Sequence, residues 1–258
     1  PLLGRWFNPD PAMQFLNPYT FCANDPVNGV DTDGNLVIFI NGFSARYWAK
    51  NYFNPGNLLA SGTNWKGTRG DWRSSDNFDL KVMAHLRDYN AIYRDGNSLG
   101  LLRKSFYPNN RFKDGYRQGR NDAQRIVAQL FRDKYGNIIE TIKVITHSMG
   151  AAYGKGYVTA LAEYLESIGL SRSIIAFEAD FAAFQSNQQQ AVDGIPTYQI
   201  SHAGDNIAGD EIMPGAIVID TSSDRFSEHW LNSFIFQIYN LPTGNYNYNM
   251  ETGEFNPI

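Results

Sequence analysis

The segment around Ser148 constrains the fold of this chain more than any other part of the sequence. Residues 142–146, Ile-Lys-Val-Ile-Thr, have the apolar and β-branched character of a buried strand. Residues 147–152, His-Ser-Met-Gly-Ala-Ala, follow at once, and apolar residues then recur at helical spacing as far as Gly169. Because the residues after Ser148 are small, a strand and a helix can approach each other closely there. The segment therefore predicts a strand, a tight turn that holds Ser148, and a helix.

The rest of the chain alternates between patterns typical of strands and of helices. Short apolar runs predict further strands at 35–40, 90–93, 174–177, 197–201 and 216–219. Helical spacing of apolar residues predicts helices within 77–86, 121–131 and 158–168. Such alternation favours an α/β fold with a mostly parallel central sheet flanked by helices. In folds of this kind ligands bind beyond the carboxyl ends of the strands, so the candidate chemistry should lie there.

The composition disfavours several function classes. The net charge of -4 and the pI near 5.6 argue against a nucleic-acid-binding surface, because phosphate binding needs clustered lysines and arginines. The single cysteine, Cys22, rules out an internal disulfide framework and a cysteine-built metal site. No apolar stretch approaches the roughly 20 residues of a membrane-spanning helix. We therefore expect a neutral substrate and no nucleic-acid partner.

Residues 1–34 carry three turn-rich motifs in a fixed order. They read GRW-x-x-PDP at 4–11, LN-x-Y at 16–19 and N-x-PVN-x-x-D-x-DG at 24–34. This order resembles the end of the core in RHS-repeat proteins, whose repeats build a shell and whose variable segment behind the core is usually a toxin delivered into competing cells.

The resemblance to RHS proteins implies a boundary near residue 35 of this chain. Residues 1–34 would be the remnant of the core, and residues 35–258 an effector domain. The implied partners are the parent RHS shell and a cognate immunity protein. The implied location is that of a secreted effector delivered to a target bacterial cell, where it acts at the membrane or in the periplasm.

Ser148 is the candidate nucleophile. A serine on a sharp turn between strand and helix has its Oγ lifted clear of the sheet, and the helix amino terminus offers N–H groups to a developing oxyanion. The strand, the small residues and the string His-Ser-Met-Gly resemble the lipase branch of the α/β hydrolases, although Thr146 stands where G-x-S-x-G has its first glycine. A serine in front of a helix can also be an ordinary N-cap, which is the alternative interpretation.

His229 is the candidate base. In α/β hydrolases the chain order is Ser, then acid, then His, so only His202 and His229 follow the nucleophile in the required order. The patterns place His202 at the end of a predicted strand, whereas His229 follows the last predicted strand in a polar loop. A surface or helix-capping histidine is the alternative.

Asp205 is the candidate acid that orients the base. The stretch 201–207, Ser-His-Ala-Gly-Asp-Asn-Ile, resembles the segment of class 3 lipases in which an aspartate follows a strand and a short polar turn. Such a carboxylate would accept the imidazole Nδ1–H and hold the tautomer in which Nε2 takes the serine proton. Asp210 is the second candidate and Asp180 the third.

The turn Asn41-Gly42-Phe43 resembles the His-Gly turn of esterases, with Asn41 in the histidine position. The resemblance implies an oxyanion hole built from the N–H groups of Phe43 and Met149. Many aromatic residues follow between 44 and 72 without clear periodicity. They predict an aromatic-rich cap over the site, with Phe43, Tyr47 and Trp48 as substrate contacts. Long loops also need aromatic anchors of their own, so both interpretations stand.

Together these features predict an α/β-hydrolase fold with an aromatic-rich cap. The expected activity is that of a lipase or phospholipase that works through a Ser-His-Asp triad and an acyl-enzyme, without metal or cofactor. The expected partners are a lipid or phospholipid substrate and the membrane surface. Two other hypotheses remain: an inactive hydrolase scaffold that serves as a binding module, and an amidase or peptidase with the same triad.

Overall fold

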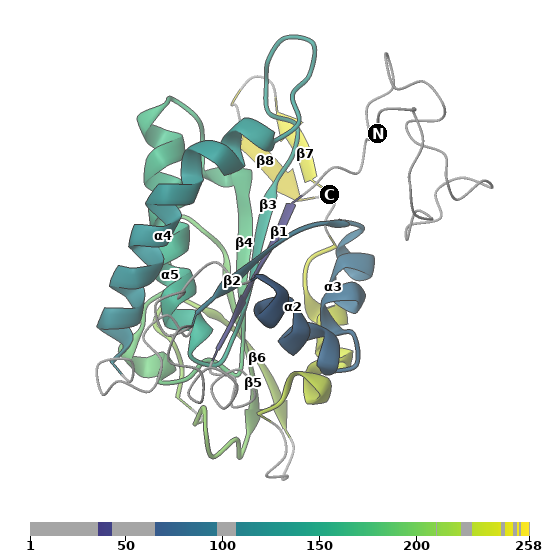
Figure 1. Cartoon of the computed structure of the whole chain (residues 1–258), viewed down its shortest axis with the longest axis vertical. Coiled ribbons are helices and arrows are strands. Elements are labelled where there is room, and N and C mark those ends of the chain that lie inside the picture. Colours follow the sequence, from purple (N-terminus) through teal and green to yellow (C-terminus); the bar gives the residue numbers. More distant parts are fainter. Residues whose placement is uncertain are drawn as a thin grey trace, which may run out of the picture.

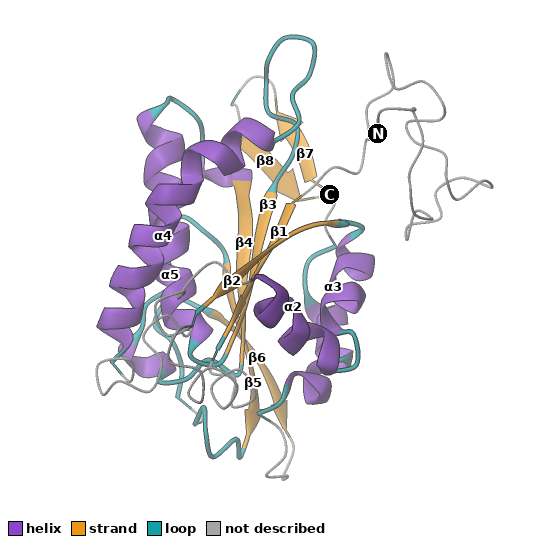
Figure 2. Ribbon diagram, viewed as in Figure 1, coloured by secondary structure: helices purple, strands orange, loops and turns teal. Residues whose placement is uncertain are grey.

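A computed structural model gives the three-dimensional structure of the chain, in which a six-stranded sheet lies between two layers of helices (Figures 1 and 2). The structure describes residues 36–42, 65–96, 107–209, 211–222, 229–243, 246–249, 252 and 254–257. The predicted RHS core remnant at 1–34 lies outside these ranges, so its boundary with the effector domain stays a prediction.

The sheet is parallel throughout and has the order β2-β1-β3-β4-β5-β6. Its strands are β1 (Leu36–Asn41), β2 (Asn90–Asp95), β3 (Ile142–His147), β4 (Ile175–Phe181), β5 (Thr197–Ala203) and β6 (Ile217–Ser222). The prediction of an α/β fold with a mostly parallel sheet flanked by helices is therefore confirmed. A separate antiparallel pair, β7 (Tyr246–Asn249) and β8 (Glu254–Pro257), was not predicted.

Helices cover both faces of this sheet (Figure 1). On one face lie α4 (Pro108–Gln129) and α5 (Gly150–Ser167). On the other lie α2 (Trp65–Ser74), α3 (Phe78–Leu86) and the 3-10 helices Leu231–Phe234 and Phe236–Asn240. Two further 3-10 turns, Arg172–Ile174 and Ser186–Gln188, adjoin β4. No described helix is long and apolar enough to span a membrane.

The strand β1 shows why the core has two halves. All its residues are buried, and successive side chains point to opposite faces of the sheet. Leu36, Ile38 and Ile40 belong to the apolar cluster under α4 and α5, whereas Val37 and Phe39 belong to the cluster under α2 and α3. A strand buried on both faces is expected where parallel strands are covered by helices on each side.

Helix α4 is longer than its sequence pattern predicts. The periodic apolar residues begin near residue 121, but the helix begins at Pro108. The part of the helix before residue 121 contains Gly115 and Gly119, which weaken helix propensity by about 1 kcal/mol each relative to alanine. A Cβ at either glycine would collide with the main-chain oxygen of Tyr153 or Tyr157 on α5. Tertiary packing against α5 therefore accounts for glycines that the local pattern does not favour.

Helix α2 also departs from the sequence prediction. Its residues 65–72 fall in the aromatic stretch that was expected to be an irregular cap. Trp72 is fully buried, with its ring 5.0 Å from that of Phe39 and 5.9 Å from that of Phe78. Trp72, at the end of the aromatic stretch, therefore belongs to the core. The remainder of the predicted cap, at 43–64, lies outside the described residues.

Candidate active site

Ser148 occupies the tight turn between β3 and α5. Its φ angle is 55°, in the left-handed region that a residue with a side chain rarely adopts. Its N–H donates to the carbonyl of Phe181 at 2.9 Å, and its carbonyl accepts from the N–H groups of Ala151 and Phe184, each at 3.2 Å. These main-chain bonds hold the strained turn in place. The N-cap of α5 is Met149 rather than Ser148, so the N-cap interpretation of this serine was wrong.

Thr146 fits in this turn although a glycine is usual at its position. The threonine is fully buried, and its Oγ1 donates to Asp180 at 2.6 Å. Its methyl group lies against the first turns of α5 at Gly154, where an added Cβ would be 2.6 Å from Cγ2 of Thr146. Gly154 on α5 therefore leaves the space that the methyl group of Thr146 needs. The departure from G-x-S-x-G therefore leaves the turn intact.

Ser148, His229 and Asp205 form one chain of hydrogen bonds. Nε2 of His229 lies 2.8 Å from Oγ of Ser148, and Nδ1 of His229 lies 2.8 Å from Oδ2 of Asp205. The three residues have exposed fractions of 5%, 6% and 3% respectively, so all are buried. They come from the carboxyl end of β3, the segment after β6 and the turn after β5. The structure thus brings together all three residues that the sequence predicted as a triad.

The surroundings of Asp205 favour its ionised form, which accepts hydrogen bonds. Its Oδ1 accepts from the main-chain N–H groups of Ile207, at 2.9 Å, and Ala208, at 3.0 Å. Burial opposes the ionised carboxyl, but the bonds from His229 and Ala208 outweigh it and lower the pKa of Asp205. An ionised carboxylate only accepts, so Nδ1 of His229 carries the proton and Nε2 offers a lone pair to the serine hydroxyl.

The structure describes two of the other candidates for acid and base, Asp180 and His202. Asp180 is buried on β4, where it is bound by Thr146 and Lys155 rather than by His229. His202 lies on β5 with its ring stacked on Phe234 at 4.2 Å. Asp210 lies outside the described residues.

The end of β1 lies directly against the turn that holds Ser148. A Cβ added to Gly42 would be 2.8 Å from Cβ of Ser148 and 2.9 Å from N of Met149. Nδ2 of Asn41 donates to the carbonyl of Gly42 at 3.0 Å and to Oδ2 of Asp71 at 3.3 Å. This arrangement puts Gly42 against the main chain of the turn that holds Ser148 and Met149. The other predicted oxyanion donor, Phe43, and the predicted substrate contacts Tyr47 and Trp48 lie outside the described residues.

We expect the substitution Gly42→Ala to lower turnover about a hundredfold, because a displacement of roughly 1 Å at the reacting centre has an effect of that size. The new methyl group would be under 3 Å from main-chain atoms of the Ser148 turn, so one of the two segments must shift. Turnover of a soluble ester, measured beside the far-ultraviolet circular dichroism of the variant, checks this. A folded Gly42→Ala protein with wild-type turnover would contradict the close approach.

No protein-family profile matches the sequence, and no curated protein aligns with it significantly. Our proposal for the chemistry of the site is therefore based on its geometry.

A buried cluster of ionisable side chains lies behind the turn that holds Ser148, and the sequence patterns did not predict it. Nζ of Lys155 on α5 lies 3.0 Å from Oε2 of Glu178 and also binds Asp180, both on β4. All three side chains are at least 97% buried. Burial raises the pKa of Glu178 to about 8. The signal in the sequence was Glu178 and Asp180 inside an otherwise apolar strand, since buried charges need partners.

We expect Lys155→Met to lower the free energy of unfolding by about 3–5 kcal/mol, because it removes the cation from two buried carboxyl groups. Denaturant unfolding at neutral pH would measure this loss. Lys113→Met on the exposed face of α4 is the matched control, and it should change stability by no more than about 0.5 kcal/mol. Equal losses in the two variants would show that the buried cluster contributes nothing particular.

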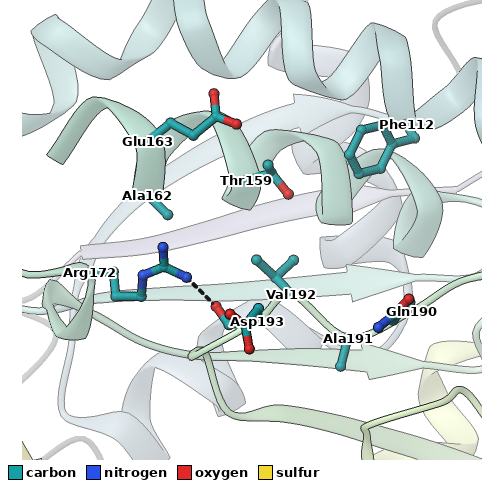
Figure 3. A pocket seen from close by; sticks show the side chains of 9 residues that line it. All are labelled: Phe112, Thr159, Ala162, Glu163, Arg172, Gln190, Ala191, Val192 and Asp193. Carbon is teal, nitrogen blue, oxygen red and sulfur yellow. Dashed lines mark hydrogen bonds between the residues drawn. The ribbon is translucent and has the colours of Figure 1, made fainter. Parts of the chain in front are cut away.

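Two pockets lie on the side of the sheet covered by α4 and α5. One, of about 400 Å³, lies between α5 and residues 190–193 (Figure 3). In it Nη1 of Arg172 donates to the carbonyl of Asp193 at 2.5 Å. The other, of about 520 Å³, is lined by residues that include Ala152, Lys155 and the start of α4. Neither is lined by a triad residue. Among the described residues no cluster of three or more His, Cys, Asp or Glu could hold a metal ion.

Proposed function

We propose that this chain is a serine hydrolase of the α/β-hydrolase fold that cleaves an ester through an acyl-enzyme. The observation that carries the proposal is the buried hydrogen-bonded chain from Asp205 through His229 to Ser148. The order of the three residues along the chain, each beyond the carboxyl end of a strand, supports it.

The proposed reaction has two halves. Oγ of Ser148 attacks the ester carbonyl carbon while its proton passes to Nε2 of His229. The C–O bond then breaks, and the same proton goes to the leaving alkoxide. A water molecule attacks the acyl-enzyme in the second half, gives its proton to His229, and Ser148 regains a proton when the acid leaves.

The oxyanion that forms in each half needs hydrogen-bond donors. The N–H of Met149 lies at the amino terminus of α5, beside Ser148, and is one proposed donor. The N–H of Phe43 is the second and stays a prediction. Loss of one such donor typically lowers turnover about a hundredfold or more.

We propose a lipid ester, and specifically a phospholipid, as the substrate. Apolar side chains lie exposed next to two triad residues: Trp230 follows His229 and is 57% exposed, and Ile207 lies two residues after Asp205 and is 46% exposed. The ring of Trp230 lies 6.4 Å from that of His229. Trp is favoured at the boundary between lipid and water because its body is apolar and its N–H is polar.

Hydrolysis of defined vesicles tests the proposed activity. The purified chain would be incubated with phosphatidylethanolamine and phosphatidylglycerol vesicles, with a soluble short-chain ester and with the matching amide. We expect free fatty acid and lysolipid from the vesicles. Cleavage of the ester alone would reduce the proposal to an esterase, faster cleavage of the amide would make the chain an amidase, and no cleavage at all would contradict the proposed function.

The RHS-like motifs at 1–34 support the proposal that the hydrolase is a delivered effector with a cognate immunity protein. Expression in bacteria with and without an export signal tests this. We expect dye entry and lysolipid only in cells that export the wild-type chain. Killing by the His229→Ala variant equal to that of the wild type would mean that toxicity does not come from hydrolysis, and would favour a binding module.

A further inference from the structure

His147, the residue before the proposed nucleophile, makes a contact with the proposed base. Its Nε2 lies 2.8 Å from the main-chain carbonyl oxygen of His229. A carbonyl oxygen only accepts, so Nε2 of His147 must be the donor and carry the proton. This bond joins residues 82 positions apart in the chain. It ties the carboxyl end of β3 to the segment that follows β6.

His229 lies in a turn outside the strands and helices, so its position depends on such contacts. Its side chain is bound at Nδ1 by Asp205, and the carbonyl of its main chain is bound by His147. Together the two bonds fix both the side chain and the main chain of His229. With the main chain free to move, the imidazole could keep its bond to Asp205 and still drift away from Oγ of Ser148.

The ring of His147 is itself held in place and is neutral. It packs edge-on against Trp72, with the ring centres 6.4 Å apart. Burial and the nearby ring of His229 lower the pKa of His147 to about 4. At neutral pH it therefore puts no positive charge beside His229, whose ring centre is 5.3 Å away. A charge there would oppose the imidazolium that forms when His229 takes the serine proton.

We infer that His147 is a positioning residue, whose Nε2–H holds the main-chain carbonyl of His229 and thereby keeps the base in reach of Ser148. The inference rests on the proposed function, because it assigns His147 a part in activating the same serine. His147 contacts no reacting atom in this account. It acts through His229.

Three substitutions of His147 separate the effect of its hydrogen bond from the effect of its ring packing. His147→Phe keeps a ring against Trp72 but has no donor. His147→Gln has an amide nitrogen that reaches about as far as Nε2, whereas the amide of His147→Asn falls about one bond short. The Gln and Asn variants form a matched polar pair, which keeps the test valid if the Phe variant does not fold.

The test measures kcat and KM for a soluble ester, the rate at which a fluorophosphonate labels Ser148, and the melting temperature. We expect His147→Phe and His147→Asn to lower kcat and the labelling rate about tenfold to a hundredfold, with KM within about twofold of the wild type. His147→Gln should recover most of this loss. A purely structural role would instead make the rates follow the melting temperature in all three variants.

The possible failures are distinguishable. If the wild type reacts and the Asn and Gln variants react equally fast, His147 is not a positioning residue, while the proposed function stands. The same follows if the rates track only the melting temperature. If the wild type neither cleaves the ester nor reacts with the fluorophosphonate, the proposed function is wrong and the inference falls with it.

Discussion

Ser148→Ala is expected to abolish ester hydrolysis while the protein stays folded. The substitution removes Oγ, the atom that we propose attacks the carbonyl carbon, and in comparable triads the loss of the nucleophile lowers turnover by a factor on the order of 10⁵ or more. The fold should tolerate the change, because Ser148 is held by main-chain bonds to Phe181, Ala151 and Phe184 that alanine also makes. Ester turnover and thermal unfolding, measured on the same preparation, check both halves of the prediction.

A control is needed at another buried serine. Ser186 is fully buried, and its Oγ donates to the carbonyl of Glu211 rather than to a triad residue. Ser186→Ala should change stability more than Ser148→Ala and leave turnover near that of the wild type. Wild-type turnover in the Ser148→Ala protein would show that another group performs the attack.

Asp205→Asn is expected to lower turnover by about 10⁴, because an amide nitrogen at this position favours the wrong tautomer of the imidazole. In the native protein the carboxylate accepts from Nδ1 of His229 and leaves Nε2 free to take the serine proton. Asparagine can turn its NH₂ group toward Nδ1, after which Nε2 carries the hydrogen. The substitution keeps the size of the side chain, so turnover is the sensitive measurement.

Asp210→Asn is the matched comparison, since Asp210 is the second candidate acid that the sequence offers. It should leave turnover within a few-fold of the wild type. A larger loss in Asp210→Asn than in Asp205→Asn would move the orienting acid to Asp210.

The architecture could be predicted because most elements carry strong local patterns. The runs that form β1, β3 and β4 are short and apolar, and α5 has apolar residues at helical spacing with a glycine at its end. Such patterns arise because one or both faces of an element are buried, and they can be recognised in the residues of that element alone. The part of α4 before residue 121 lacks such a pattern, and its glycines Gly115 and Gly119 are explained by close contact with α5.

The three triad residues could be predicted because chain order and strand ends limit the choices. Contacts between segments that are distant in the sequence could not be predicted. Nothing near Thr146 indicates that Gly154 makes room for its methyl group, and nothing near His147 indicates that its ring binds the main chain of His229. The cluster of Lys155 with Glu178 and Asp180 likewise forms only when α5 lies on β4. Each of these contacts forms only in the tertiary structure, so no local sequence pattern indicates it.

Labelling by a fluorophosphonate tests whether His229 activates Ser148, because this reagent modifies a serine only when a base activates it. The site of modification and its rate would be measured by mass spectrometry for the wild type and for His229→Ala. We expect modification of the wild type at Ser148 and at least about a hundredfold slower modification of His229→Ala. No modification of Ser148, or equal rates in the two proteins, would contradict it.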